Sequence, residues 1–170
     1  MRGARKVALA VGTGVVTKTF ETWVDAPVDE VWDFHSTAEA LVALTPPGRK
    51  VELIGQDLDV REGAEHRIRV RVGPFPVEWR ARISDVEPPR RFVDTAEKSP
   101  FAYWQHVHEF VSEGDRTLLR DTVTYIPPMG LIGWVANALF ISRDIDRMFA
   151  FRHRVTKEEV ERRTRSSPRP

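Results

Sequence analysis

Two strand-like segments lie near the middle of the chain and are separated by a short turn. Residues 101–111 (FAYWQHVHEFV) and 118–125 (LLRDTVTY) are rich in aromatic and β-branched side chains, which favour strands. Residues 114–115 are a Gly-Asp pair, which is typical of a two-residue hairpin loop. The sequence therefore predicts an antiparallel hairpin over residues 101–125, and the fold has to contain a sheet that includes it.

The two-residue turn also sets the register of this hairpin. Glu113 then lies opposite Arg116, and His108 lies opposite Asp121. Directly opposed Cβ atoms are about 4.5–5.5 Å apart, which is close enough for a hydrogen bond between His108 and Asp121. Side chains alternate between faces, so one face of the hairpin collects Trp104, His106, His108 and Phe110 with Leu119, Asp121, Val123 and Tyr125. This mixture of aromatic rings, histidines and a carboxylate indicates the wall of a partly polar internal cavity.

The patterns in the rest of the chain limit the fold further. Residues 65–72 alternate between apolar and charged side chains, as a half-buried antiparallel strand does. Residues 130–163 are expected to be helical, with a break near the start, because apolar side chains recur there at helical spacing. The other expected elements are a strand at 17–25, short helices from Pro27 and from Ser36 to Leu44, and strands at 51–54, 77–83 and around 92–93. This order predicts an α+β fold in which a curved antiparallel sheet wraps around a long C-terminal helix.

Length and composition narrow the classes of protein further. A chain of 170 residues is expected to form one domain, here residues 17–163, between an N-terminal extension (1–16) and a polar tail (164–170). With 26 Lys and Arg against 25 Asp and Glu, the charge gives no argument for nucleic acid as a partner. The lack of cysteine excludes disulfides, thiolate metal sites and cysteine nucleophiles. Because the apolar run near the N-terminus is too short for a secretory signal, a cytoplasmic location is expected.

Several short sequence motifs resemble those of a known superfamily. They are Val24-Asp-Ala-Pro-Val-Asp-Glu-Val-Trp32, Glu87-Pro-Pro-Arg-Arg-Phe92, Tyr103-Trp-Gln-His-Val-His-Glu-Phe110, Asp121-Thr-Val-Thr-Tyr125, Pro128-Met-Gly130 and Phe149-Ala-Phe-Arg-His-Arg154. Together they resemble the SRPBCC superfamily of START-like, helix-grip, polyketide cyclase/dehydrase-like proteins, over residues 17–160. The nearest subgroup is one of bacterial proteins described only as ligand-binding. The resemblance implies a hydrophobic cavity between sheet and helix, and it transfers no catalytic residues.

From the face pattern and this resemblance, we expect the cavity to bind a small hydrophobic ligand with at least one polar group, of lipid, isoprenoid or aromatic polyketide type. The His108–Asp121 pair would hold the polar end. The alternative is a cyclase, aromatase or dehydratase that uses His108 and Asp121 as an acid–base pair, which is the less favoured of the two. The expected ligand-binding residues are His66, Trp104, His106, His108, Asp121, Tyr125, Ile145, Met148 and Phe149.

The sequence also bears on a metal site, a membrane contact and a protein partner. His106 and His108, with Asp121 and His66, would suit a metal ion, but no HExxH or cysteine pattern supports one, so neither a metal nor a cofactor is expected. Residues 131–134 with Phe140 are expected to pack over the cavity mouth, and transient membrane contact is left as an alternative. The arginines between residues 67 and 82 are expected to form a solvated sheet face. A protein-interaction module built on that face or on the long helix is a third class, and the expected state is a monomer or weak dimer.

Overall fold

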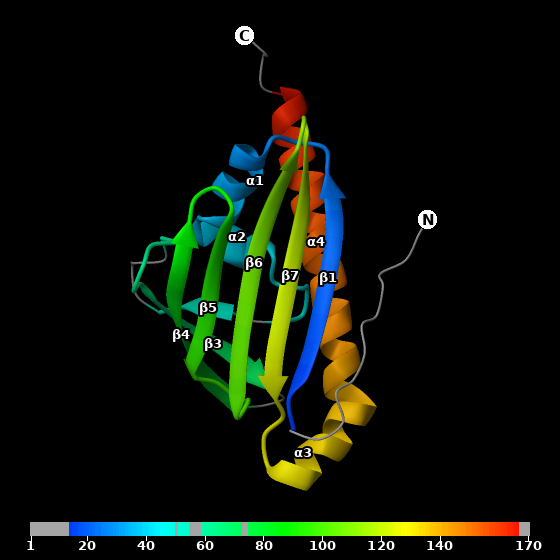
Figure 1. Ribbon diagram of the computed structural model, residues 1–170. Coiled ribbons are helices and arrows are strands. Elements are labelled where there is room, and N and C mark those ends of the chain that lie inside the picture. The colour runs from blue at the N-terminus through cyan, green and yellow to red at the C-terminus, as the bar shows by residue number, and fades with distance from the viewer. Residues whose placement is uncertain (1–13, 50, 55–58, 73–74, 167–170) are drawn as a thin grey trace.

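The computed structural model describes residues 14–49, 51–54, 59–72 and 75–166. Within them, the strands form one antiparallel sheet in the order β1-β7-β6-β5-β4-β3-β2. The elements are β1 (Val16–Val24), α1 (Val28–His35), α2 (Ala38–Ala43), β2 (Val51–Leu53), β3 (Glu65–Val72), β4 (Phe75–Glu87), β5 (Arg91–Lys98), β6 (Tyr103–Glu113), β7 (Arg116–Ile126), α3 (Gly130–Ala136), a π-helical turn (Asn137–Ile141) and α4 (Ser142–Ser166). Figure 1 shows α4 running along one face of the curved sheet, with α1 and α2 near one end and α3 at the other. The α+β prediction of a sheet wrapped around a long C-terminal helix is confirmed.

The hairpin formed by β6 and β7 has the predicted register. Glu113 pairs with Arg116, His108 with Asp121, and Trp104 with Tyr125. Gly114 adopts a φ of 62° in the turn, a left-handed conformation that glycine reaches without steric penalty. The face predicted from alternation is therefore the face that looks toward α4.

Three elements differ from the expectation. Strand β5 extends to Lys98 instead of stopping near residue 93, because its antiparallel pairing with β4 and β6 outweighs the low strand propensity of its polar side chains. Helix α2 begins after Thr37, whose Oγ1 accepts a hydrogen bond from the Ala40 amide at 3.3 Å, so the cap lies one residue later than expected. The predicted break in the last helix is the π-helical turn, and α4 continues to Ser166. The proposed N-terminal extension and polar tail lie largely outside the described residues.

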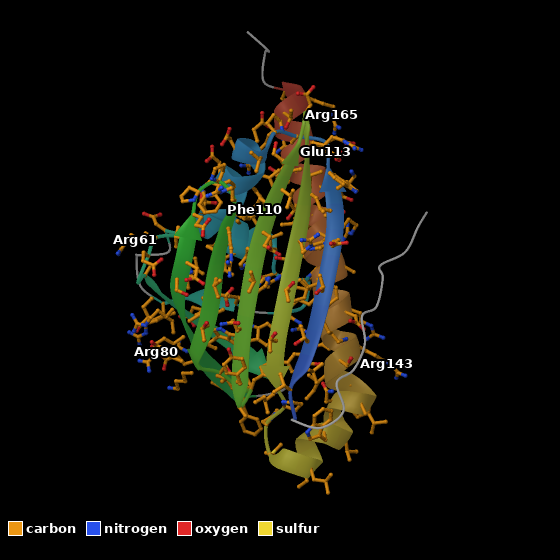
Figure 2. All side chains as sticks on the ribbon, in the orientation of Figure 1. Arg61, Arg80, Phe110, Glu113, Arg143 and Arg165 are labelled. Atoms are coloured by element: carbon orange, nitrogen blue, oxygen red, sulfur yellow. The ribbon has the colours of Figure 1, made fainter. Side chains whose placement is uncertain are left out.

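The outer face of the sheet is charged and solvated, as expected. Arg67 pairs with Glu78 at 3.0 Å, Arg82 pairs with Glu97 at 2.5 Å, and all four side chains remain well exposed or partly exposed. Figure 2 shows Arg80 among the charged side chains on the β4 side of the sheet. Each of these arginines is therefore balanced by a nearby carboxylate, and the face is not a continuous basic surface.

Two apolar clusters lie in the interior formed by the described residues. One surrounds Trp32 of α1 and Phe92 of β5, and the other surrounds Phe149 of α4, whose ring stacks on Phe20 at 4.6 Å between centroids. His108 stacks on Phe92 at 3.9 Å, and His106 meets the edge of Phe149 at 5.0 Å. The two histidines predicted to lie in the cavity wall therefore sit at the junction of the two clusters.

Candidate functional site

A cavity of about 420 Å³ lies between the sheet and the helices. This is within the usual range for a small-molecule site, about 300–1,000 Å³. Its apolar wall comes from β3, β4, β6 and α4, and its polar end is formed by Asp94, His106, His108 and Arg152. A second hollow, of about 510 Å³, lies beside Pro46 and Pro47, and no histidine lines it among the described residues. The first cavity is therefore the one that joins an apolar wall to buried ionisable groups.

Six of the nine side chains predicted to bind a ligand line this cavity. They are His66, Trp104, His106, His108, Ile145 and Met148.

The structure places the other three elsewhere. Asp121 is buried behind His106, and Phe149 is enclosed against Phe20. Tyr125 is fully buried and donates a hydrogen bond from its hydroxyl to Asn137 Oδ1 at 2.8 Å. For Asp121 and Tyr125 the reason is topological, because β7 lies between β1 and β6 while the cavity is bounded by β3 to β6.

Asp121 is the centre of a buried hydrogen-bond network. Its Oδ1 accepts from His106 Nε2 at 2.8 Å, and its Oδ2 accepts from His153 Nε2 at 2.6 Å. His108 Nδ1 lies 3.3 Å from Oδ1 but makes no hydrogen bond. The expected hydrogen bond between His108 and Asp121 is thus replaced by bonds from His106 and His153, although the strand register is correct.

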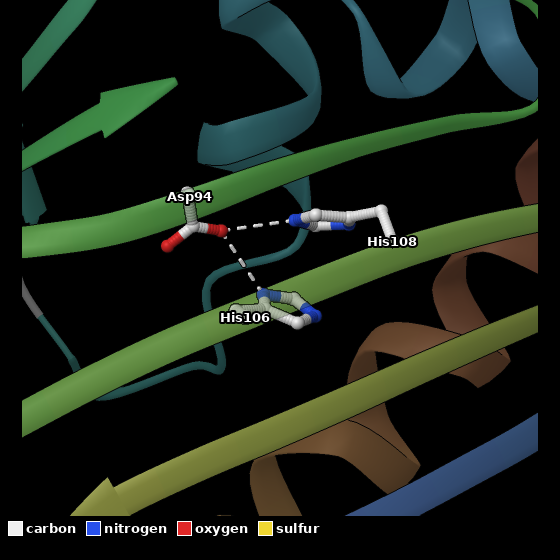
Figure 3. Close-up of side chains that lie close together, drawn as sticks. All are labelled: Asp94, His106 and His108. Atoms are coloured by element: carbon white, nitrogen blue, oxygen red, sulfur yellow. Dashed lines mark hydrogen bonds and ion pairs between the residues drawn. The ribbon is translucent and has the colours of Figure 1, made fainter. Parts of the chain in front are cut away.

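Asp94 forms the other half of the network. Its Oδ2 lies 3.0 Å from His108 Nε2 and 3.2 Å from His106 Nδ1 (Figure 3). Stacking on Phe92 holds the His108 ring toward β5, which explains why this ring bonds to Asp94 and not to Asp121. Both carboxylates are therefore bridged by the His106 ring, with one at each of its nitrogens.

These contacts shift the pKa values of His106, Asp94 and Asp121. Burial opposes charge on His106, but attraction to Asp121 and hydrogen bonds to Asp121 and Asp94 outweigh it and raise the pKa of His106 to about 9. Burial also opposes charge on the carboxyls, yet the histidines hold the pKa values of Asp94 and Asp121 well below the usual range. At neutral pH the site therefore contains the buried Asp121 carboxylate, the partly buried Asp94 carboxylate and the His106 imidazolium.

His35 behaves in the opposite way. Burial is the main influence and lowers its pKa to about 4, although its Nδ1 donates to the Val31 carbonyl at 2.9 Å. Its ring faces His108 at 6.5 Å between centroids. The neutral His35 ring therefore closes the polar end on the α1 side without adding charge.

Four site residues were missed at the level of sequence: His35, Asp94, Arg152 and His153. Asp94 was missed because β5 was expected to be short. A signal was present for the two helical residues, since Arg152 and His153 follow Ile145 and Phe149 at helical spacing. Polar side chains at such positions on an apolar helix face are candidates for a buried site.

Arg152 is the least satisfied group at the polar end. Its guanidinium lies 5.4 Å from the centre of the Phe149 ring, and its buried Nε has no hydrogen-bond partner. Within the described part of the chain, no hydrogen bond or ion pair joins it to another side chain. The arrangement can thus donate hydrogen bonds to a ligand oxygen, move a proton through His106 and His108, or hold a cation between Asp94 and the two rings.

An apolar surface lies on α3 and the π-helical turn, between Pro128 and Ile141 of the cavity lining. Leu131, Ile132 and Phe140 are 81%, 70% and 69% exposed, so the expectation that these three side chains pack against the protein is wrong. Trp134 of the same segment does pack inward, against the cluster around Phe149. Gly133 allows this segment to approach the preceding loop, because a Cβ there would lie 1.6 Å from the Pro128 carbonyl oxygen. Of the helices described, none has the length and hydrophobicity needed to span a bilayer.

Comparison with known proteins identifies the family of this chain and other proteins with the same fold. A family model described as "Polyketide cyclase / dehydrase and lipid transport" matches residues 24–152. No curated protein sequence matches significantly.

Solved structures with the same fold include three of 19–21% identity. The ZhuI aromatase/cyclase from a Streptomyces species is 19% identical with a TM-score of 0.72, over 89% of this chain and 97% of that one. The protein TTHA0849 from Thermus thermophilus is 21% identical with a TM-score of 0.68, over 89% and 100%. A norcoclaurine synthase from Thalictrum flavum is 20% identical with a TM-score of 0.66, over 91% and 99%.

Proposed function

Because this chain belongs to the polyketide cyclase / dehydrase and lipid transport family, we propose that its cavity binds a small hydrophobic molecule that carries an oxygen-containing polar group. The apolar wall, which includes Trp104, Ile145 and Met148, would enclose the hydrophobic part. A cytoplasmic location and a monomeric or weakly dimeric state, both expected from the sequence, belong to this proposal.

The observation that carries the proposal is the state of Arg152. The Arg152 side chain is partly buried, and Asp94 and Asp121 attract its charge without accepting a hydrogen bond from its buried Nε. A buried N–H that makes no hydrogen bond is costly, because the hydration that it loses on folding is not replaced. Arg152 lines the cavity together with Asp94 and His108. Arg49, another arginine of the lining, is by contrast paired with Asp144. A carboxylate, enolate or carbonyl oxygen of a ligand would satisfy the Arg152 guanidinium and would fix the direction in which the ligand enters.

The test uses 8-anilinonaphthalene-1-sulfonate, a fluorescent probe with an aromatic body and an anionic group. We expect saturable binding of one probe per chain. Met148→Trp should abolish it by filling the cavity, because Met148 lines the wall. Met129→Trp is the matched control, since Met129 is 73% exposed and lies outside the lining. Equal binding by both variants, or no binding by the native chain, would contradict the proposal.

The alternative function is an enzyme of cyclase, aromatase or dehydratase type, now with His106 and His108 as the proton-transfer groups. The observation in its favour is the His106 imidazolium held between two carboxylates beside the cavity. A neighbour in fold, the ZhuI protein, is an aromatase/cyclase. The test is incubation with an oligoketide thioester and detection of a dehydrated product by mass. Turnover that is lost in His108→Gln while probe affinity is retained would favour the enzyme.

We further propose that the exposed apolar surface of α3 and the π-helical turn touches a membrane while the cavity exchanges its ligand. Its position supports this, because Pro128 and Ile141, which border the surface in sequence, line the cavity. Exposed apolar patches of this kind are uncommon on isolated soluble domains. Sedimentation with neutral and anionic phospholipid vesicles measures this contact directly, and we expect Leu131→Ser to bind them more weakly than the native chain. Equal binding of the two proteins to the vesicles would refute the proposal.

A further inference from the structure

Three potential metal ligands converge at the polar end of the cavity. Asp94 of β5 pairs across the sheet with His106 of β6, and His108 follows two residues later on the same face. Figure 3 shows the Asp94 carboxylate pointing toward both imidazole rings. One ligand atom from each residue lies within 4.8 Å of the other two. The strand pairing therefore brings together two histidines and one carboxylate without help from any loop.

The distances suit a shared cation. Metal–nitrogen and metal–oxygen bonds of about 2.0–2.2 Å place neighbouring ligand atoms roughly 3.0–3.5 Å apart in a tetrahedral or octahedral site. Asp94 Oδ2 lies 3.2 Å from His106 Nδ1 and 3.0 Å from His108 Nε2. Only a small outward adjustment would admit an ion, although hydrogen bonds alone would also produce these distances. The groups around the two imidazole rings distinguish a metal site from a cluster held by hydrogen bonds alone.

The far nitrogen of each ring faces a second carboxylate. His106 Nε2 donates to Asp121 Oδ1 at 2.8 Å, and His108 Nδ1 lies 3.3 Å from the same oxygen. Asp121 is itself fixed by His153. Histidines that bind metals characteristically donate their other N–H to a carboxylate or carbonyl, which orients the ring and selects its tautomer. Asp121 stands in that position toward His106, and it lies close to the far nitrogen of His108 without a hydrogen bond to it.

One nitrogen of His108 lacks a partner that a cation would supply. His108 Nε2 lies 3.0 Å from Asp94 Oδ2, whereas the buried Nδ1 faces Asp121 Oδ1 at 3.3 Å without a hydrogen bond. An ion bound at Nε2 would leave the ring N–H on Nδ1, where it can be donated to Asp121. The ion would also place positive charge between the Asp94 and Asp121 carboxylates.

We propose that Asp94, His106 and His108 form a binding site for one divalent transition-metal ion of the zinc or iron(II) class. The three ligands line the cavity, so the remaining coordination positions would face a bound molecule. The site thus goes beyond the proposed ligand binding, because a metal-free cavity would still accept a hydrophobic probe. An oxygen atom of the ligand would be the natural fourth donor.

The experiment is metal binding to untagged, chelator-stripped protein, measured with Zn²⁺ by equilibrium dialysis and with Co²⁺ by visible absorption. We expect one ion per chain. Asp94→Asn and His108→Gln should weaken binding more than about 100-fold, beyond the 10–100-fold loss typical of an outer-shell change such as Asp121→Asn. His66→Gln is the matched control, because His66 lines the same cavity away from the three ligands and should leave the affinity unchanged.

Two results would overturn the proposal. The first is the lack of stoichiometric binding of either ion by the native chain. The second is binding that survives in both Asp94→Asn and His108→Gln. Circular dichroism identifies variants that fail to fold, and in that case paramagnetic shifts of the His106 and His108 ring signals in native protein loaded with Co²⁺ locate the ion. Repeating the anilinonaphthalene titration with chelator present separates a failed metal site from a failed ligand cavity.

Discussion

The two faces of the sheet both carry charged side chains, but they place them in opposite environments. On the outer face, Glu78 accepts hydrogen bonds from Arg67 and Lys98 in contact with solvent. On the inner face, Asp94 and Asp121 are enclosed among three histidines and aromatic rings. Water can replace the hydrogen-bond partners of the outer charged groups. The inner groups depend on one another for their hydrogen bonds.

This difference indicates which charged groups are better explained by function than by a contribution to stability. Exposed ion pairs contribute little to stability, because the charges are well hydrated before and after folding. A buried charge needs its partners, and a well-packed apolar set would often be at least as stable. The inner network is therefore better explained by binding or chemistry at the cavity than by stability.

The largest expected effect comes from breaking the inner network at its centre. Asp121→Ala leaves His106 and His153 without their acceptor, and loss of one member of a buried charged pair is expected to lower the free energy of unfolding by about 3–5 kcal/mol. Urea denaturation followed by circular dichroism measures it. The outer-face control is Glu78→Gln, for which we expect no measurable change in the urea midpoint. Similar effects of the two substitutions would contradict the distinction between the faces.

The second effect separates stability from binding within the cavity. Arg152→Met removes a partly buried cation whose Nε has no hydrogen-bond partner, so the free protein should keep most of its stability. Affinity for the anionic probe should fall by about 10–100-fold, which corresponds to the roughly 1.5–3 kcal/mol of a hydrogen bond to a charged group. Arg154→Met on the exposed side of α4 is the control and should change neither quantity. A large loss of stability in Arg152→Met would show that the guanidinium is structural.

A smaller effect is the dependence of stability on pH in chelator-treated protein. Between pH 6.5 and about 4, unfolded His35 binds a proton that the folded chain, with its lowered pKa, does not, so stability falls as the pH falls. Between pH 6.5 and about 9, folded His106 keeps a proton that the unfolded chain has lost, so stability falls as the pH rises. The free energy of unfolding should therefore be greatest near pH 6.5.

Substitution of one histidine tests the acid side of this profile. His35→Gln should flatten the limb between pH 6.5 and 4 and leave the alkaline limb intact. Asp94 and Asp121 act in a separate window, since their lowered pKa values cause a further loss of stability only below about pH 4, where unfolded carboxyls protonate. An acid limb that is unchanged in His35→Gln would show that this ring is not buried in neutral form.

The hairpin and the cavity show how far the sequence alone can lead. Strand alternation and a two-residue turn are local rules, and they were enough to pair His108 with Asp121 in register. The actual hydrogen bonds depend on packing of Phe92 against His108 and on the approach of His153 from α4, which are contacts between distant segments. Asp94 was missed because the length of β5 is set by its neighbours in the sheet. The local pattern therefore predicted which side chains share the inner face of the hairpin. Tertiary packing determined which of their atoms form hydrogen bonds.

Native mass spectrometry of the protein purified from cells tests directly whether the cavity holds a small hydrophobic molecule. We expect an additional mass of roughly the size of a drug-like ligand that disappears on denaturation, extracts into organic solvent and is missing in Met148→Trp but present in Met129→Trp. A bare polypeptide mass, both as purified and after incubation with a cellular lipid extract, would contradict it.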